Sequence, residues 1–362
     1  MLNYEQKLVL CNDWVVSLGN MSRLDSRVLY ALCGSVAGAV IVGSISLIFF
    51  YHIQPTTLRP LRESDIPSSG GYMFTDPLIG VSANGNPTSS IYSSLEQRVQ
   101  SFIDSQKMSG LFSASVKFSD ILQSDGFTIN EDETYDPASL TKVPLAIAYY
   151  NLAAQDQSIL SDQVIYTGTP DLDANEQIRS AVQLYPGQSY TVEILIEHMI
   201  KYSDNNAEQL LADHLAARNK LDILTSLFAN LGVKIDPTHP DDMTVQSYSL
   251  FLRTLFNATY LDRNYSEKLL QLLSESDFSQ GIDAGVPNNV LVAEKFGDAK
   301  IPDAKGNVIG AELHNCGIVY YPKHPFLLCI MTKGSNLTTL EHVIAGISHL
   351  IYQGVQGQYQ VI

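Results

Sequence analysis

Predicted β-strands stand near both ends of the long C-terminal part of this chain, and helices fill the stretch between them. Short apolar runs bounded by turn residues predict strands at 111–118, 127–130, 290–295, 316–321 and 326–332. Residues 190–275 follow helical periods throughout. Strands that enclose helices in this way predict an α/β (α+β) fold, in which a helical insertion at about 160–280 interrupts a sheet domain.

Helix boundaries are marked by residues that favour helix ends. We expect helices to begin at Ser93 or Ser94, Ser139, Thr191, Asn206 and Thr244, and one to end at Gly232. A last helix is predicted at about 339–352, and the last two strands are predicted to form a hairpin around Pro322–Pro325.

An uncharged apolar run of 24 residues, Val28–Tyr51, precedes this domain. As a helix it would measure about 36 Å, enough to cross a bilayer. A buried soluble helix and a cleaved signal peptide are the alternatives. The 27-residue leader and the lack of a small-residue cleavage site after Tyr51 favour a retained anchor. Arg23 and Arg27 lie close before the run, which favours an N-terminus inside and the large domain outside.

The chain is therefore expected to have four parts. They are a short cytoplasmic N-terminus at 1–27, a transmembrane anchor at 28–51, a Pro/Ser/Gly-rich tether at 52–94 and a globular domain at 95–362. Within the tether, the apolar residues from Tyr72 to Ile79 are expected to dock on the domain. We therefore expect a single-pass protein of the cell membrane whose domain lies outside the cytoplasm.

Charge and cysteine content exclude several classes of function. The formal net charge is −16, from 38 acidic and 22 basic residues, which argues against nucleic acid as a partner. The four cysteines form no C-x-x-C pair and the eight histidines no H-E-x-x-H motif, so neither a metal nor another cofactor is predicted. Cys316 and Cys329 lie on the two arms of the predicted hairpin. Because its register is unknown, two buried thiols are favoured over a disulfide.

The chain contains one S-x-x-K sequence, Ser139-Leu140-Thr141-Lys142. It precedes a wholly apolar run, so we expect these residues to form the first turn of a buried helix. A residue three positions on lies on the same helix face, which brings Lys142 within reach of the Ser139 hydroxyl. A desolvated lysine can take the proton of a serine and make it a nucleophile. An N-cap serine beside a lysine with an extended side chain is the structural alternative.

Two further motifs follow in the chain. Ser203-Asp204-Asn205 lies at a predicted helix junction, where a second hydroxyl could relay a proton and an amide could fix a substrate carbonyl, although ordinary helix capping explains it too. Lys295-Phe296-Gly297-Asp298 lies at the end of a predicted strand. There the ammonium could hold a carboxylate and the glycine could let the backbone approach a ligand; an exposed lysine at a strand end is the alternative.

In this order, the three motifs resemble those of the penicillin-recognising serine hydrolases, specifically class A β-lactamase-like proteins. The matching residues are Pro137–Pro144, Tyr202–Ala207 and Lys295–Gly297, and the resemblance covers about residues 90–355. It implies a β-lactamase/transpeptidase-like fold of two subdomains: a five-stranded antiparallel sheet flanked by helices, and an all-helical subdomain with the site between them.

The resemblance also implies the roles of the site residues. Ser139 would be the acylated nucleophile, Lys142 its base, Ser203 a proton relay and Lys295 a holder of the substrate carboxylate. Asn205, Phe296, Gly297 and Asp298 would line the substrate site, with the backbone N–H groups of Ser139 and Asp298 as the oxyanion hole. The substrate would be a β-lactam or a peptidoglycan-type D-alanyl peptide.

Two departures from the family pattern bear on turnover. Phe296 stands where a hydroxyl residue usually binds the substrate carboxylate. The short segment after Gly232 has no glutamate to activate the deacylating water, only Asp236, Asp241 and Asp242. Slow deacylation is therefore expected. A D,D-peptidase, a non-catalytic membrane-anchored binding domain and an esterase or amidase acting on other acyl groups remain as alternatives.

Overall fold

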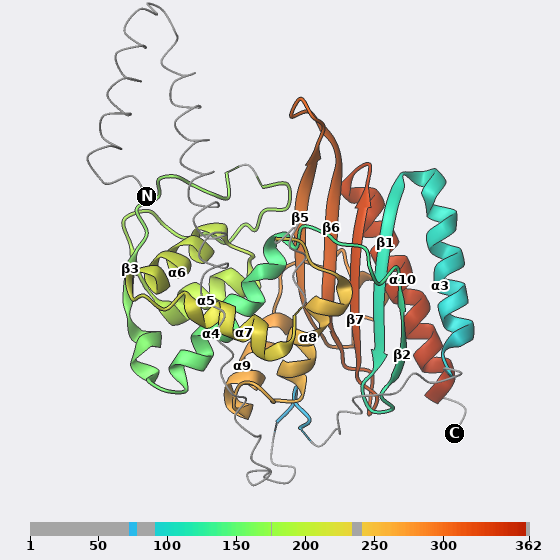
Figure 1. The fold of residues 1–362 in the computed structure, drawn as a ribbon, viewed down its shortest axis with the longest axis horizontal. Helices are drawn as coiled ribbons and strands as arrows, with labels where there is room; N and C mark the ends of the chain where they lie inside the picture. Colours follow the sequence, from blue (N-terminus) through green and yellow to red (C-terminus); the bar gives the residue numbers. More distant parts are fainter. Residues whose placement is uncertain (1–71, 78–90, 175, 234–240, 360–362) are drawn as a thin grey trace, which may run out of the picture. The chain divides into compact units, whose positions relative to one another are not determined.

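A five-stranded antiparallel sheet forms the middle of the structure, a computed structural model that describes residues 72–77, 91–174, 176–233 and 241–359 (Figure 1). All of these residues belong to one compact unit. The expected cytoplasmic N-terminus, the anchor at 28–51 and most of the tether lie outside the described residues. Within the described ranges, no helix is both long and apolar enough to span a membrane.

The sheet has the strand order β2-β1-β7-β6-β5, which places the last three strands beside the first. The strands are β1 (Leu111–Asp120), β2 (Asp125–Ile129), β5 (Val292–Pro302), β6 (Val308–Val319) and β7 (Phe326–Gly334). All five predicted strands are confirmed, including the β6–β7 hairpin. The central pairing of β1 with β7 joins segments from opposite ends of the domain. The helical insertion lies between them in the chain, as the strand pattern predicts.

The two faces of the sheet bury two separate apolar clusters. Helices α3 (Ser93–Gln106) and α10 (Leu337–Tyr359) cover one face, where Val99, Phe118 and Ile347 are buried. The opposite face packs on the helical subdomain, through residues such as Cys329 and Phe251. Because side chains alternate along a strand, neighbouring residues of β5 enter different clusters. This alternation decides which motif residues face the helical subdomain.

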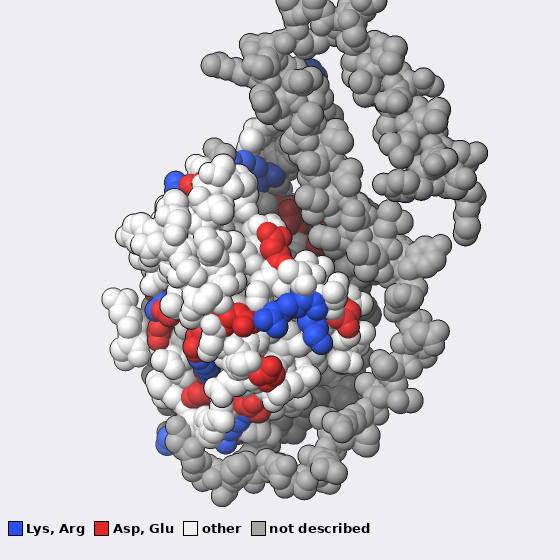
Figure 2. Space-filling view, turned by 90° about the vertical axis from the view of Figure 1, so that its left-hand side faces the viewer, with Lys and Arg blue, Asp and Glu red and all other residues white. Residues whose placement is uncertain are grey.

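The helical subdomain contains six α-helices and a small two-stranded sheet among the described residues. The helices are α4 (Lys142–Ala153), α5 (Val192–Lys201), α6 (Asn205–Ala217), α7 (Asp222–Leu231), α8 (Val245–Phe256) and α9 (Arg263–Ser274); β3 (Gln163–Ile165) pairs with β4 (Ser189–Thr191). Helix α4 is buried on nearly all sides, which explains its uniformly apolar sequence. On the helical side of the unit, acidic and basic side chains are interspersed (Figure 2).

Local capping chemistry confirms three of the predicted helix boundaries. The side chains of Thr191 and Thr244 accept hydrogen bonds from the first turns of α5 and α8, and Gly232 ends α7 in the left-handed conformation. The prediction that Asn206 caps α6 is wrong. The cap is Asp204, whose carboxylate accepts a 2.8 Å hydrogen bond from the Ala207 N–H group, so the helix begins at Asn205.

Two predictions about the C-terminal strands also need correction. The Lys295–Gly297 motif lies inside β5 rather than at its end, because β5 pairs with β6 beyond it as far as Pro302. Cys316 and Cys329 form a disulfide, where two thiols were expected. They are directly opposite each other in the β6–β7 register, and Cys316 is in turn opposite Lys295. That register, which was unknown from the sequence, brings the two sulfur atoms together.

A short segment of the predicted tether, residues 72–77, docks on the helical subdomain. Phe74 is buried against the ring of Tyr320, whose hydroxyl donates a 3.0 Å hydrogen bond to the Phe74 carbonyl. The Glu267 carboxylate of α9 accepts hydrogen bonds from the Phe74 N–H group at 2.8 Å and the Thr75 hydroxyl at 3.1 Å. Docking is therefore confirmed for this part, while Leu78 and Ile79 lie outside the described residues.

Candidate active site

The candidate nucleophile lies in a tight turn that leads into α4. Residues Ala138–Thr141 form a 3₁₀ turn, closed by a 3.0 Å hydrogen bond from the Leu140 N–H group to the Pro137 carbonyl. Ala138, just before Ser139, has a φ of 48°. Strained backbone of this kind is typical of functional sites. The turn sets Ser139 just before the buried helix α4, so the predicted first helical turn is a 3₁₀ turn and α4 itself begins at Lys142.

Lys142 is fully buried and makes three polar contacts. Its Nζ lies 2.7 Å from Ser139 Oγ and 2.6 Å from Asn205 Oδ1. It also forms a 2.8 Å ion pair with the Glu208 carboxylate. The S-x-x-K lysine therefore connects Ser139 with two side chains of α6.

The second motif forms the junction between α5 and α6. Ser203 has a φ of 54°, so the chain reverses here before Asp204 caps α6. The Asp173 carboxylate supports the junction by accepting a 2.9 Å hydrogen bond from the Asn205 N–H group. Burial, together with the neighbouring Asp204, raises the pKa of Asp173 to about 6. The junction directs Asn205 toward Lys142 and Ser203 toward β5.

Lys295 reaches the same site from the sheet. It is fully buried and donates hydrogen bonds to Ser203 Oγ at 2.8 Å and to the Phe296 carbonyl at 2.9 Å. Burial and the positive charge of Lys142 hold the pKa of Lys295 well below its usual range. A lysine in this environment exchanges protons more readily than an exposed one.

Gly297 lets β5 pack directly against the turn of the nucleophile. A Cβ atom at this position would lie 2.7 Å from the Pro137 carbonyl oxygen and 3.1 Å from the Ser139 nitrogen. Any side chain would therefore push strand and turn apart. The close approach brings the backbone on either side of Gly297 next to Ser139, where the oxyanion hole is expected.

The two residues beside Gly297 have different surroundings. Phe296 is buried, stacks on Phe278 and covers Lys295 Nζ at 4.2 Å from the ring centre. Its ring therefore supports the lysine, and the structure does not show it lining an open substrate site. The half-buried Asp298 carboxylate accepts a 3.4 Å hydrogen bond from Gln177. Burial and the charge of Glu176 raise the pKa of Asp298 to about 6.

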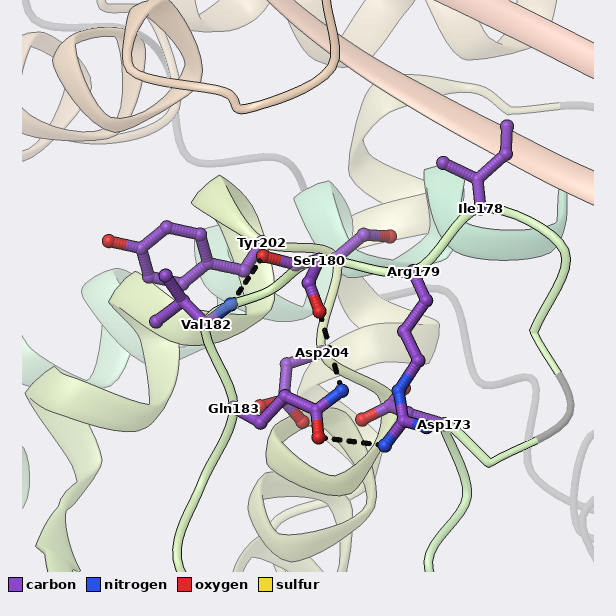
Figure 3. Close-up of a pocket in the computed structure, with 9 residues that line it drawn as sticks. Asp173, Ile178, Arg179, Ser180, Val182, Gln183, Tyr202 and Asp204 are labelled. Atoms are coloured by element: carbon purple, nitrogen blue, oxygen red, sulfur yellow. Dashed lines mark hydrogen bonds between the residues drawn. The ribbon is translucent and has the colours of Figure 1, made fainter.

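A small pocket opens beside Ser203 (Figure 3). The loop between β3 and β4 and the second motif line this pocket, through Asp173, Ile178, Arg179, Ser180, Val182, Gln183, Tyr202, Ser203 and Asp204. Arg179 extends past Asp173 and donates hydrogen bonds to Gln183 at 2.7 Å and to Asp171 at 3.2 Å. The loop therefore forms one wall next to the second motif.

The carboxylate that contacts the S-x-x-K lysine is not one of the aspartates that the sequence offered after Gly232. Asp242 accepts a 3.4 Å hydrogen bond from Thr134, and Asp236 lies outside the described residues. Sequence reasoning missed Glu208, which contacts Lys142 directly. Glu208 follows Asn205 by three positions, so both lie on one face of α6. That spacing was the signal that could have identified it.

Across the described ranges, no group of three or more His, Cys, Asp or Glu side chains is arranged to hold a metal ion. Two serines, each hydrogen-bonded to a buried lysine, are the side chains that a serine hydrolase requires.

The chain belongs to the β-lactamase enzyme family, whose profile matches residues 94–355. It is a β-lactamase-like serine hydrolase, and the resemblance seen in the sequence is confirmed. No curated protein matches the chain.

Solved structures share the fold. PBP-A is 20% identical, with a TM-score of 0.61 over 73% of this chain and 97% of its own. A PBP-A mutant, described as an acyl-enzyme complex with penicillin G, is 20% identical, with a TM-score of 0.60 over 73% of this chain and 97% of its own. A β-lactamase from Sphaerobacter thermophilus is 20% identical, with a TM-score of 0.58 over 71% of this chain and 96% of its own.

Proposed function

We propose that this protein forms an ester between Ser139 and the acyl group of a β-lactam or a D-alanyl peptide, and that it releases this acyl group slowly. The contact that carries the proposal is the 2.7 Å hydrogen bond between the buried Lys142 and Ser139 Oγ. It joins a nucleophile to a base inside a family of serine hydrolases. The penicillin G acyl-enzyme of the PBP-A mutant supports a β-lactam as one substrate class.

Acylation proceeds through one bond formed and one broken. Ser139 Oγ attacks the substrate carbonyl carbon while its proton passes to Lys142. The C–N bond then breaks, and the leaving nitrogen takes the proton of the Ser203 hydroxyl. Ser203 in turn receives a proton from Lys295, which donates a hydrogen bond to it. Because Asn205 Oδ1 faces Lys142, its amide N–H groups are the ones that serve the substrate's amide carbonyl.

The oxyanion of the tetrahedral intermediate is stabilised by the backbone N–H groups of Ser139 and Asp298. Support comes from the close packing of Gly297 on the Ser139 turn. Each donor of this kind typically contributes about 3–4 kcal/mol to the transition state. Lys295 holds the substrate carboxylate. Phe296 adds no hydroxyl to help it, so binding of carboxylated β-lactams depends on that lysine.

The positions of the described carboxylates support slow deacylation. Hydrolysis of the ester needs a base that activates a water molecule within about 3 Å. Among the described residues, Asp242 contacts Thr134 instead, and the Glu208 carboxylate is held by an ion pair with Lys142 through one oxygen and by a hydrogen bond from Thr141 to the other. The acyl group is therefore expected to stay on Ser139.

A peptidoglycan substrate agrees with a domain held outside the cytoplasm by the anchor at 28–51. The Cys316–Cys329 disulfide supports this location, because disulfides persist in oxidising compartments. Protease added to intact cells should cut the tether at 54–94 and release the soluble domain. Release only after the cells are broken open would mean the reverse orientation.

A fluorescent penicillin tests the proposal. We expect covalent labelling of the full chain that disappears in Ser139→Ala and persists in Ser101→Ala, an exposed serine of α3. Labelling that does not depend on Ser139 would contradict acylation by penicillin. In that case, parallel reactions with a D-alanyl peptide and a simple ester distinguish a peptidase or an esterase from a non-catalytic binding domain.

A further inference from the structure

Glu208 is the third partner of the catalytic lysine. One carboxylate oxygen lies 2.8 Å from Lys142 Nζ, and the other accepts a 3.0 Å hydrogen bond from the Thr141 hydroxyl. The Lys142 side chain is completely buried, whereas that of Glu208 is 28% exposed. Glu208 therefore connects the buried amine to the open side of the site.

The contacts of Lys142 show why a further proton acceptor is needed. An ammonium group has three N–H donors and no lone pair, and three oxygen atoms surround this one. The hydrogen bond to Ser139 then runs from the lysine to the serine, opposite to the direction that base catalysis requires. Lys142 must lose a proton before it can accept one. Of its three partners, only the Glu208 carboxylate is basic enough to take it.

We propose that Glu208 is the proton acceptor that makes Lys142 a base, a role that rests on acylation of Ser139. Lys142 gives one proton to Glu208 and takes the proton of Ser139 as Oγ bonds to the electrophile. The pair then holds one proton more than at rest, which returns to the leaving group or to solvent. Glu208 acts through Lys142, so it is a positioning and relay residue.

Several other charged side chains lie near this pair. Lys295 and Asp298 lie near it on β5 and Asp173 lies near it on the loop between β3 and β4, while Asp204 neighbours Asp173 at the start of α6. Replacing Glu208 by glutamine removes the acceptor and leaves these charges in place.

The test measures the reactivity of Ser139 without relying on penicillin recognition. The full chain is treated with an alkyl fluorophosphonate that carries a fluorophore. Serine oxygen bonds to phosphorus, fluoride leaves, and the serine proton passes to the Lys142–Glu208 pair. The second-order rate constant of labelling is measured from pH 5 to 9 for the unsubstituted chain and for Glu208→Gln, Glu208→Asp, Ser139→Ala and Asp213→Asn. Asp213 is an exposed carboxylate on the same helix.

We expect Glu208→Gln to react about 10²-fold more slowly at pH 7, the usual contribution of general-base help. Its rate should rise with pH, because Lys142 must then lose its proton to solvent. Glu208→Asp should restore most of the rate, and Asp213→Asn should not change it. The unsubstituted chain should show no such rise between pH 7 and 9.

Three results would overturn the proposal. In the first, Glu208→Gln has the same labelling rate and pH profile as the unsubstituted chain. In the second, the labelling rate of the unsubstituted chain rises steeply with pH. In the third, Ser139 of the unsubstituted chain does not react. Labelling by the fluorophosphonate but not by penicillin would refute the β-lactam substrate alone. The failures of the two proposals are therefore distinguishable.

Discussion

The Lys142 amine lies 2.7 Å from the Ser139 hydroxyl, at the point where the 3₁₀ turn enters α4. Replacing Lys142 by methionine keeps most of the length of the buried side chain and removes the base. We expect the rate of penicillin labelling to fall about 10²–10⁴-fold. Lys107→Met, an exposed lysine at the end of α3, is the control. Unchanged labelling in a folded Lys142→Met chain would mean that another group activates Ser139.

Asp298 gives a prediction about pH. Its pKa of about 6 means that the carboxylate is charged at neutral pH beside Lys295, where it repels the carboxylate of penicillin. Asp298→Asn should therefore raise the acylation rate about fivefold at pH 8, as expected for a repulsion of about 1 kcal/mol, and leave it unchanged at pH 5. Asp303→Asn, in the turn between β5 and β6, is the matched control. A rate ratio that does not vary with pH would contradict the electrostatic account.

Glu294 links stability to pH. It is fully buried, and burial with the nearby Asp283 raises its pKa to about 8 from 4.5. The folded state therefore keeps a proton that the unfolded chain loses, so the free energy of unfolding falls as the pH rises between these values. The slope approaches about 1.4 kcal/mol per pH unit.

The variant Glu294→Gln tests this link, because it removes the titration while keeping the side-chain shape. We expect it to match the unsubstituted chain at pH 4.5 and to be clearly more stable at pH 8, in urea unfolding followed by circular dichroism. Glu131→Gln, an exposed glutamate after β2, should not change the pH dependence. An equal stability difference at every pH would refute the raised pKa.

The Cys316–Cys329 disulfide is tested by counting thiols. The full chain has four cysteines, so two should react with a thiol reagent when the protein is denatured without reduction, and four after reduction. Replacing both bridged cysteines by alanine should destabilise the domain by about 2–4 kcal/mol. Four reactive thiols before reduction would rule the bridge out.

Much of the fold was predictable because its signals are local. Thr191, Thr244 and Gly232 mark helix ends by their own side chains or backbone freedom, and apolar runs mark all five sheet strands. The N-cap of α6 was assigned to Asn206 instead of Asp204. Both are good capping residues, and only the observed hydrogen bond distinguishes them.

The remaining features depend on contacts between distant parts of the chain. The disulfide required the β6–β7 register, and the position of the third motif inside β5 required its pairing with β6. The site motifs were found by their spacing, and the structure brings Ser139, Lys142 and Asn205 together as the resemblance implies. Glu208 was missed because its ion pair with Lys142 depends on the packing of α6 beside α4, although its spacing from Asn205 placed both residues on one face of α6.

The lifetime of the penicillin adduct tests the central claim most directly. The full chain is mixed with penicillin, and its intact mass is followed over time, together with hydrolysed penicillin in solution. We expect a mass increase of one penicillin per chain that depends on Ser139 and persists, with little product beyond one equivalent. Rapid loss of the adduct with catalytic release of hydrolysed penicillin would contradict slow deacylation, and the absence of any adduct would contradict acylation by penicillin itself.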